Sequence, residues 1–394
     1  MTDHHLQLPG LAMALLAAAT GCATASRSRA PQEQVLHLRG QPVPATVLQP
    51  SLADFEVPPN VAVLHYYGAG GWGIQWRGTY VLAAPYFSNH DLVALLGSPL
   101  VKLAPKEAEV RAGLAGTPVG KTSVILIGHG HVDHSGDVPA LFGEGLIAGR
   151  PALLADRSTT NQLAALSSRF GCVASIDFDD PEQAASACPV PGVRITPLHH
   201  AHAPHLNLVG LDVAAYGGSV KAPRVDEPSR ADDYKLGNVW AYLIDLLDER
   251  GAVVFRIHYV DAAGSPPHGL VPPGLLAERD VDVHIACVPG FEQVEDYPEA
   301  MLERHHGRFV LLGHWEDFFQ PRGAPLRPLR QVLDEPALER FVDVVERTLA
   351  GARGGGPLNK TAERCAPPHA CGPRGETWAL PVPGETFQFA TASK

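Results

Sequence analysis

The segment TSVILIGHGHVDHSGD, residues 122–137, joins an apolar run to a cluster of metal-binding side chains. Its first six residues predict a β-strand that is buried on both faces. His129 and His131 are two positions apart, so extended backbone places both on one side of the chain. Asp133 and His134 follow where the chain is expected to turn into a helix. Four metal-binding side chains therefore leave one strand end in two directions, as two adjacent ions require.

Later strands are predicted to end just before further His and Asp residues. The runs 193–198, 255–260 and 309–313 lead into a histidine cluster, Asp261 and His314, respectively. Sites in α/β folds commonly lie at the carboxyl ends of strands. We therefore expect these side chains to meet the first cluster.

The histidine cluster HHAHAPH, residues 199–205, holds two candidates for a third ligand. Alternation along the preceding strand places His200 and His202 on one side of the chain, which favours them over His199 and His205. Alternation does not separate these two.

The ordered set of ligands resembles that of the metallo-β-lactamase superfamily. The resemblance implies an α/β fold built as a four-layer αββα sandwich. It implies the following ligands for two ions: His129, His131 and either His200 or His202 for the first, Asp133, His134 and His314 for the second, and Asp261 as the bridge. It also gives catalytic roles to Asp133 and Asp261.

The chemistry implied by the resemblance is hydrolysis with two zinc ions, for which manganese or iron are alternatives. Two ions about 3.5 to 4 Å apart share a hydroxide and lower the pKa of bound water towards about 7. The expected substrate is an ester, lactone, amide or phosphodiester of a small molecule or a lipid. Two other functions are alternatives: a mononuclear iron dioxygenase of the same superfamily, and a non-catalytic metal-binding lipoprotein.

Weaker motifs are similar to one branch of the superfamily, which contains ascorbate-phosphate lactonase and N-acyl phosphatidylethanolamine phospholipase D. They are VLAAPYFS at residues 81–88, Thr196-Pro197 and His314-Trp315. Ala84 stands where that branch usually has Asp, so the substrate of the branch does not transfer directly.

The composition predicts a folded domain and argues against a nucleic-acid partner. The chain has 394 residues, of which 45% are hydrophobic, enough for a sizeable core. Its 42 acidic residues against 31 basic ones give a net charge of -11, which repels phosphate backbones.

The N-terminus predicts export. Residues 8–19 form an apolar run that is too short to span a bilayer and fits a secretory signal. The ending Ala19-Thr20-Gly21-Cys22 resembles a bacterial lipobox, which implies acylation of Cys22. We therefore expect a lipid-anchored protein that faces the periplasm or the outside and contacts the membrane only through this anchor.

The cysteines agree with an exported chain. Cys172 and Cys188, and likewise Cys365 and Cys371, are spaced to close small disulfide loops, whereas Cys287 lies in an apolar run and is expected to be a buried free thiol. The expected organisation is a signal segment at 1–22, a linker at 23–58, the catalytic domain at 59–350 and a Gly/Pro-rich tail at 351–394.

Overall fold

The computed structural model describes residues 35–45, 57–98, 100–204, 207–208, 211–212, 216–330, 332–351, 360–364 and 371–391. They belong to one compact unit that begins at Val35. The expected signal segment, with Cys22, lies outside the described residues, as do His205 and Cys365. In the described part of the chain, no helix is long and apolar enough to cross a membrane.

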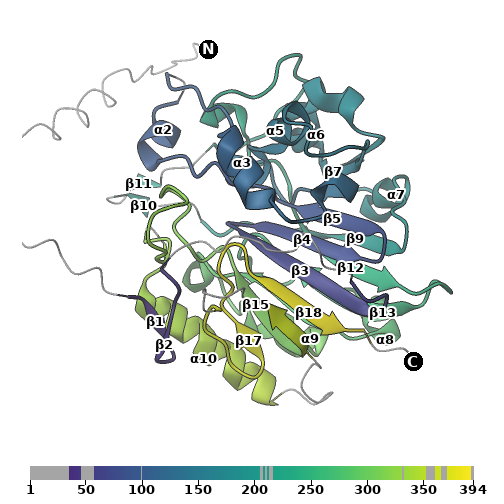
Figure 1. Cartoon of the computed structure of the whole chain (residues 1–394), viewed down its shortest axis with the longest axis vertical. Helices are drawn as coiled ribbons and strands as arrows, with labels where there is room; N and C mark the ends of the chain where they lie inside the picture. Colours follow the sequence, from purple (N-terminus) through teal and green to yellow (C-terminus); the bar gives the residue numbers. More distant parts are fainter. Residues whose placement is uncertain are drawn as a thin grey trace, which may run out of the picture. The chain divides into compact units, whose positions relative to one another are not determined.

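Two large mixed sheets form the centre of this unit (Figure 1). The eight-stranded sheet has the order β16 (Lys360–Arg364), β18 (Thr386–Ala390), β3 (Val61–Gly68), β4 (Gly71–Trp76), β5 (Thr79–Ala83), β6 (Thr122–Leu126), β7 (Ala152–Asp156) and β8 (Cys172–Ile176). The six-stranded sheet has the order β17 (Trp378–Ala379), β15 (Phe309–Gly313), β14 (Val283–Cys287), β13 (Val253–Tyr259), β12 (Val239–Leu247) and β9 (Val193–His200). Small two-stranded pairs are β1 (His37–Leu38) with β2 (Gln41–Pro42), and β10 (Asn207–Leu208) with β11 (Leu211–Asp212).

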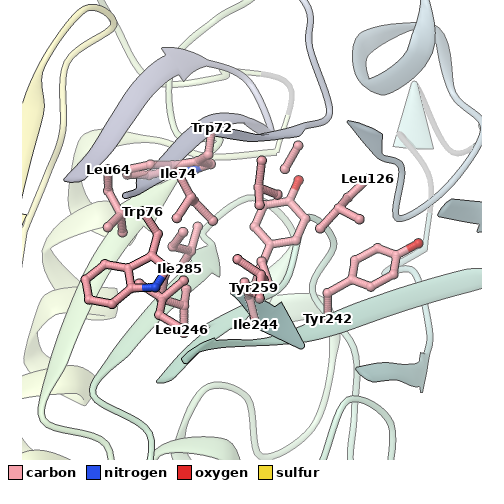
Figure 2. Packing of buried hydrophobic residues seen from close by; sticks show 14 of the residues in the cluster. Leu64, Trp72, Ile74, Trp76, Leu126, Tyr242, Ile244, Leu246, Tyr259 and Ile285 are labelled. Carbon is pink, nitrogen blue, oxygen red and sulfur yellow. The ribbon is translucent and has the colours of Figure 1, made fainter. Parts of the chain in front are cut away.

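The inner faces of the two sheets pack against each other through large apolar side chains (Figure 2). Trp72 and Trp76 of β4 belong to the same fully buried cluster as Tyr242 and Ile244 of β12 and Ile285 of β14. Alternation along each strand sends every second residue into this layer. The strands are therefore apolar on both faces, since their other faces are covered by helices.

Helices cover the outer face of each sheet and complete four layers. The larger sheet packs against α3 (Glu107–Leu114) and α5 (Val138–Gly143), whereas the smaller sheet packs against α9 (Glu299–His305) and α10 (Glu335–Gly351). The other helices are short: α2 (Leu92–Leu96), α4 (Val132–Ser135), α6 (Arg157–Gln162), α7 (Pro181–Ser186) and α8 (Pro273–Glu278). The predicted α/β sandwich with an αββα order of layers is confirmed.

Strand direction brings the candidate ligands to one edge of the smaller sheet. β12 is antiparallel to both β9 and β13, and β13, β14 and β15 are mutually parallel. β9, β13 and β15 therefore run the same way, and their carboxyl ends lie at the same edge.

The C-terminal segment, expected to be a tail after the catalytic domain, supplies strands to both sheets instead. β18 pairs with β3 in the larger sheet, and β17 pairs with β15 in the smaller one. Phe387 and Phe389 alternate into the core between the sheets. Likewise, β1 and β2 lie in the segment expected to be a linker.

One disulfide is fully described. Cys172 on β8 is bonded to Cys188, and Cys287 is a buried free thiol, both as expected. Cys371 is also disulfide-bonded, and Cys365, its expected partner, lies outside the described residues.

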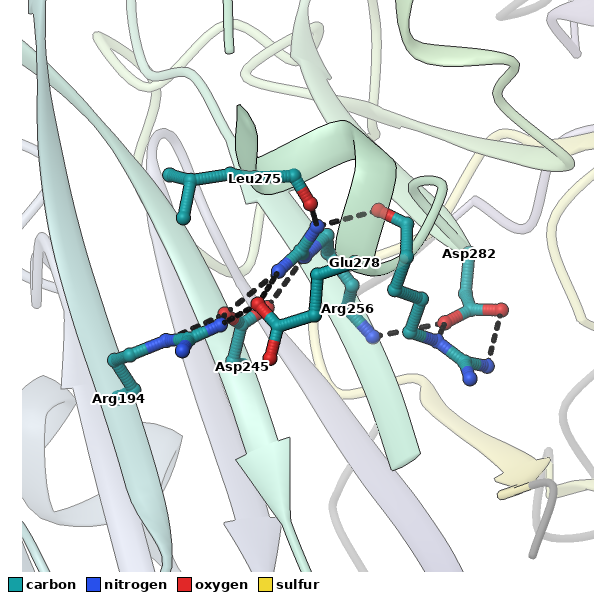
Figure 3. Close-up of polar contacts among 7 residues, drawn as sticks. Arg194, Asp245, Arg256, Leu275, Glu278 and Asp282 are labelled. Carbon is teal, nitrogen blue, oxygen red and sulfur yellow. Dashed lines mark hydrogen bonds and ion pairs between the residues drawn. The ribbon is translucent and has the colours of Figure 1, made fainter. Parts of the chain in front are cut away.

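A buried ion-pair network attaches α8 to the outer face of the smaller sheet (Figure 3). Arg256 on β13 and Asp245 on β12 are both fully buried, and the Arg256 Nε lies 2.6 Å from the Asp245 Oδ1. Arg194 on β9 donates to the same carboxylate, and its Nη2 also reaches Glu278 of α8 at 2.5 Å. The Arg256 guanidinium further donates to the carbonyl of Leu275. No side chain of α8 is fully buried, and these polar contacts add to the packing of its partly buried Leu275 and Leu276 against the core.

Three buried histidines form a second cluster under the helices of the same sheet. His258 donates from Nε2 to the Gly269 carbonyl, and its Nδ1 lies 3.2 Å from the Nδ1 of His284. The Nε2 of His305 accepts from the backbone N–H of Val271. A neutral His305 therefore carries its proton on Nδ1, which leaves that nitrogen no lone pair for a metal. We interpret this cluster as structural.

This second histidine cluster predicts a loss of stability in acid. Burial holds the pKa of His258 and His284 well below the usual range and lowers that of His305 to about 2. The unfolded chain takes up these protons near pH 6.5 and the folded chain does not, so the free energy of unfolding falls as the pH drops below about 6.5. In EDTA, which removes bound metal, the slope of the free energy of unfolding against pH is expected to be smaller for His284→Phe than for the parent chain, by about 1.4 kcal/mol per pH unit.

Urea unfolding between pH 7 and pH 5 measures this slope. His37→Gln, at an exposed position, is the matched control and is expected to keep the slope of the parent chain. Equal slopes in His284→Phe and the parent would contradict a buried neutral His284.

Candidate metal centre

Three histidines form the first ligand group. His129 and His131 lie in the loop that joins β6 to α4, and His202 follows the end of β9. Their ligand nitrogens all lie within 4.8 Å of one another. The ring centroids of His129 and His131 are 4.8 Å apart, and those of His129 and His202 are 4.9 Å apart.

A second group lies beside the first. Asp133 and His134 belong to α4, and His314 follows β15 in the left-handed backbone region, with φ of 61°. The Asp133 Oδ2 is 3.2 Å from the Nε2 of His314 and 3.3 Å from the Nε2 of His134. The Nε2 atoms of His314 and His134 are 3.3 Å apart, so the two rings lie beside each other.

Asp261, which follows β13, lies between the two groups. Its Oδ1 is 3.2 Å from the Nδ1 of His129, and its Oδ2 is 3.2 Å from the Nδ1 of His134. The hydroxyl of Tyr259 donates to the Gly70 carbonyl at 2.8 Å and lies 3.3 Å from the Oδ2 of the same carboxylate. A Cβ at Gly128 would stand 2.4 Å from the Asp261 carboxylate, so only glycine fits there.

Burial and close charges set the protonation of this centre. Burial lowers the pKa of His129. Burial would raise the pKa values of Asp133 and Asp261, but the neighbouring histidines hold both well below their usual range. Burial alone would lower the pKa of His134, but the neighbouring carboxylates of Asp133 and Asp261 raise it overall to about 10. His134 therefore carries a proton when no metal is bound, and metal binding is expected to release that proton.

The chemistry of the donor set fits divalent metal ions. The Nε2 of His129 is buried without a hydrogen-bond partner, and with Nδ1–H directed at Asp261 it carries the lone pair. Imidazole and carboxylate ligands with no thiolate suit zinc and also manganese or iron. A carboxylate that orients a ligating histidine is common in such sites.

His200, the other candidate for the third ligand, is directed away from this centre. Its Nε2–H donates to the Ala262 carbonyl at 2.8 Å, and its ring lies against Gly264 and Gly269. Alternation could not separate His200 from His202 because β9 ends at His200, so the two residues do not lie on one continuous strand.

Two further residues beside the centre were not singled out from the sequence. Asp137 makes no capping contact at the start of α5, and its carboxylate accepts from the backbone N–H groups of Phe87 and Ser88. This contact positions the loop after β5 beside the centre. Tyr259, whose hydroxyl lies 3.3 Å from Asp261, has no sequence signal that marks it.

A cavity of 160 Å³ opens above the centre. His131, Asp133, His202, Asp261 and His314 all contribute to its lining. Both ligand groups are therefore accessible to a small molecule from the same side.

The comparisons with known proteins give similar structures at low identity. No protein-family model matches the chain. No curated protein sequence matches it either. Similar solved structures include Igni18, a metallo hydrolase from Ignicoccus hospitalis, with 14% identity over 84% of this chain and 100% of that chain and a TM-score of 0.41. Another is the metallo-β-lactamase fold protein YhfI from Bacillus subtilis, with 14% identity over 64% of this chain and 85% of that chain and a TM-score of 0.36.

A third similar structure has a different chemistry. CmlA, a diiron β-hydroxylase from Streptomyces venezuelae, has 14% identity over 75% of this chain and 52% of that chain, with a TM-score of 0.41.

Proposed function

We propose that the chain is a dinuclear metal-dependent hydrolase of the metallo-β-lactamase superfamily that acts on an ester, lactone or phosphodiester. The observation that supports this most is the position of Asp261. Its two oxygens each contact a histidine of a different ligand group, and both groups line one cavity. A storage site for a metal needs neither the shared carboxylate nor the access.

The bound ions and the two carboxylates of the centre have different roles in this proposal. Two bound ions would supply a nucleophilic hydroxide at neutral pH and polarise the oxygen of the scissile bond. Asp261 fixes the distance between the groups, and the Tyr259 hydroxyl lies 3.3 Å from its carboxylate. Asp133, whose pKa is held well below its usual range by the neighbouring histidines, faces the cavity, where its carboxylate would accept a hydrogen bond from an attacking water.

Elemental analysis of the purified chain tests the metal centre. We expect about two zinc ions per chain, falling towards one in His314→Ala and in His202→Ala. His200→Gln is the matched control for His202→Ala and is expected to keep both ions, because His200 is directed at Ala262. One iron per chain would favour the dioxygenase alternative, and no metal after soaking with zinc would contradict the proposal.

We also propose that the chain is exported and anchored through Cys22. The Cys172–Cys188 disulfide supports this, since such bonds persist in oxidising compartments. Labelling with radioactive palmitate is expected to mark the parent chain and not Cys22→Ser. An unlabelled parent chain recovered from the cytosol would contradict export.

A further inference from the structure

We infer that the cavity above the candidate metal centre selects an uncharged apolar acyl group, so that the substrate is an ester or lactone with an apolar acyl chain. This inference rests on the proposed function and narrows its substrate. It follows from what the cavity walls contain beyond the candidate ligands.

Apolar side chains from distant segments form the walls of the cavity. Leu92, Leu95 and Leu96 come from α2, and Phe318 and Phe319 come from the segment after β15. The Phe318 ring lies 5.1 Å from the ring of His314, so this part of the wall begins directly at the ligands. A group attached to the reacting carbonyl would therefore lie among apolar side chains directly beside the candidate ligands.

Positive charge is missing from these walls. Among the described residues that line the cavity there is no Lys or Arg. Tyr216 lines it, but its hydroxyl donates to the Leu95 carbonyl. Lys235 packs against the same Tyr216 ring, with its Nζ 5.7 Å from the ring centroid, and is not part of the lining.

This lining disfavours a charged group away from the candidate ligands. Two bound ions would pair the charge of a reacting group, but a charge farther along the substrate would meet no Lys or Arg of the described lining, and burial of an unpaired charge is costly. An uncharged acyl chain avoids that cost, and each buried methylene is expected to improve affinity by up to about fourfold.

The size of the cavity sets an upper limit on this gain. A volume of 160 Å³ is close to that of an apolar cavity that holds one benzene ring. We expect the gain in affinity to level off at an acyl chain of about six carbons.

The test measures binding and turnover on the same zinc-loaded chain. Calorimetry compares acetohydroxamate with hexanohydroxamate, which share a metal-binding head and differ in the apolar chain. The longer probe is expected to bind about tenfold to a few hundredfold more tightly. Turnover is compared among p-nitrophenyl acetate, p-nitrophenyl hexanoate and bis(p-nitrophenyl) phosphate, and the hexanoate is expected to have the highest kcat/KM.

A pair of lysine variants on α2 locates the effect. Leu96 lines the cavity and is 45% exposed, so Leu96→Lys places a cation at the wall without disturbing the core. Val93, 76% exposed on the same helix, does not line the cavity, and Val93→Lys is the matched control. We expect the preference for the longer hydroxamate to fall at least fivefold in the first variant and to persist in the second.

The outcomes separate this inference from the proposed function. Equal affinity for both hydroxamates, or faster hydrolysis of the phosphodiester than of the hexanoate, would overturn the inference while the hydrolase stands. A preference for the longer hydroxamate without turnover of any ester or phosphodiester would support the selectivity of the cavity and contradict the hydrolase. Neither preference nor turnover would overturn both.

Discussion

The Asp261→Ala chain is expected to stay folded and to lose hydrolytic activity by more than about a hundredfold in kcat/KM. Loss of an outer partner of a metal ligand alone costs about 10- to 100-fold in activity or metal affinity. Asp261 exceeds that role, because its carboxylate contacts His129 and His134, one from each ligand group. Its removal leaves nothing to hold the two groups at a fixed distance, so the metal content is expected to fall as well.

Activity, zinc content and far-ultraviolet circular dichroism of the same preparation check this expectation. Asp226→Ala removes a carboxylate from an exposed position and is the matched control, with activity and metal content unchanged. Full activity in Asp261→Ala would show that the reaction takes place elsewhere or needs only one ligand group.

Arg256→Met is expected to lower the free energy of unfolding by about 3 to 5 kcal/mol. Arg256 is fully buried and contacts both oxygens of Asp245, which is itself fully buried. Its loss leaves Asp245 with only the half-exposed Arg194 as a cation and frees the carbonyl of Leu275. Urea unfolding of zinc-free protein measures the change without a contribution from the metal centre.

The double variant Arg256→Met with Asp245→Leu tests the cause of that loss. When both charges are removed, no unpaired charge is left between these two strands, so the double variant is expected to be more stable than Arg256→Met alone. Additive losses would indicate that the packing of the long Arg256 side chain, rather than the unpaired charge, dominates. The network lies beneath α8 and includes no candidate ligand, so activity per folded chain is expected to persist.

Much of the fold could be predicted because strand periodicity and strand ends are local features. The runs at 122–127, 193–198, 255–260 and 309–313 were expected as strands and form β6, β9, β13 and β15. Full burial on both faces makes such runs continuously apolar, which distinguishes them from the surrounding turns.

The C-terminal strands were not predictable in the same way. β17 has two residues and β18 has five, and Gly and Pro surround both. Their order comes from pairing with strands that are about 70 and more than 300 positions away in sequence. No local pattern carries that information, because it depends on the sheet edges that the rest of the chain has already formed.

By itself, the sequence determined which side chains gather at the candidate centre, since each follows a strand end and the strands are visible as apolar runs. Only the tertiary structure decided between His200 and His202, because the choice depends on where β9 stops and on the carbonyl of Ala262 that takes up the first ring. The same holds for the apolar walls of the cavity. Leu95 and Phe318 are more than 200 positions apart, and neither has a neighbour in sequence that marks it as a substrate contact. Metal chemistry is thus encoded in short motifs, whereas the selection of a substrate arises from packing between distant segments.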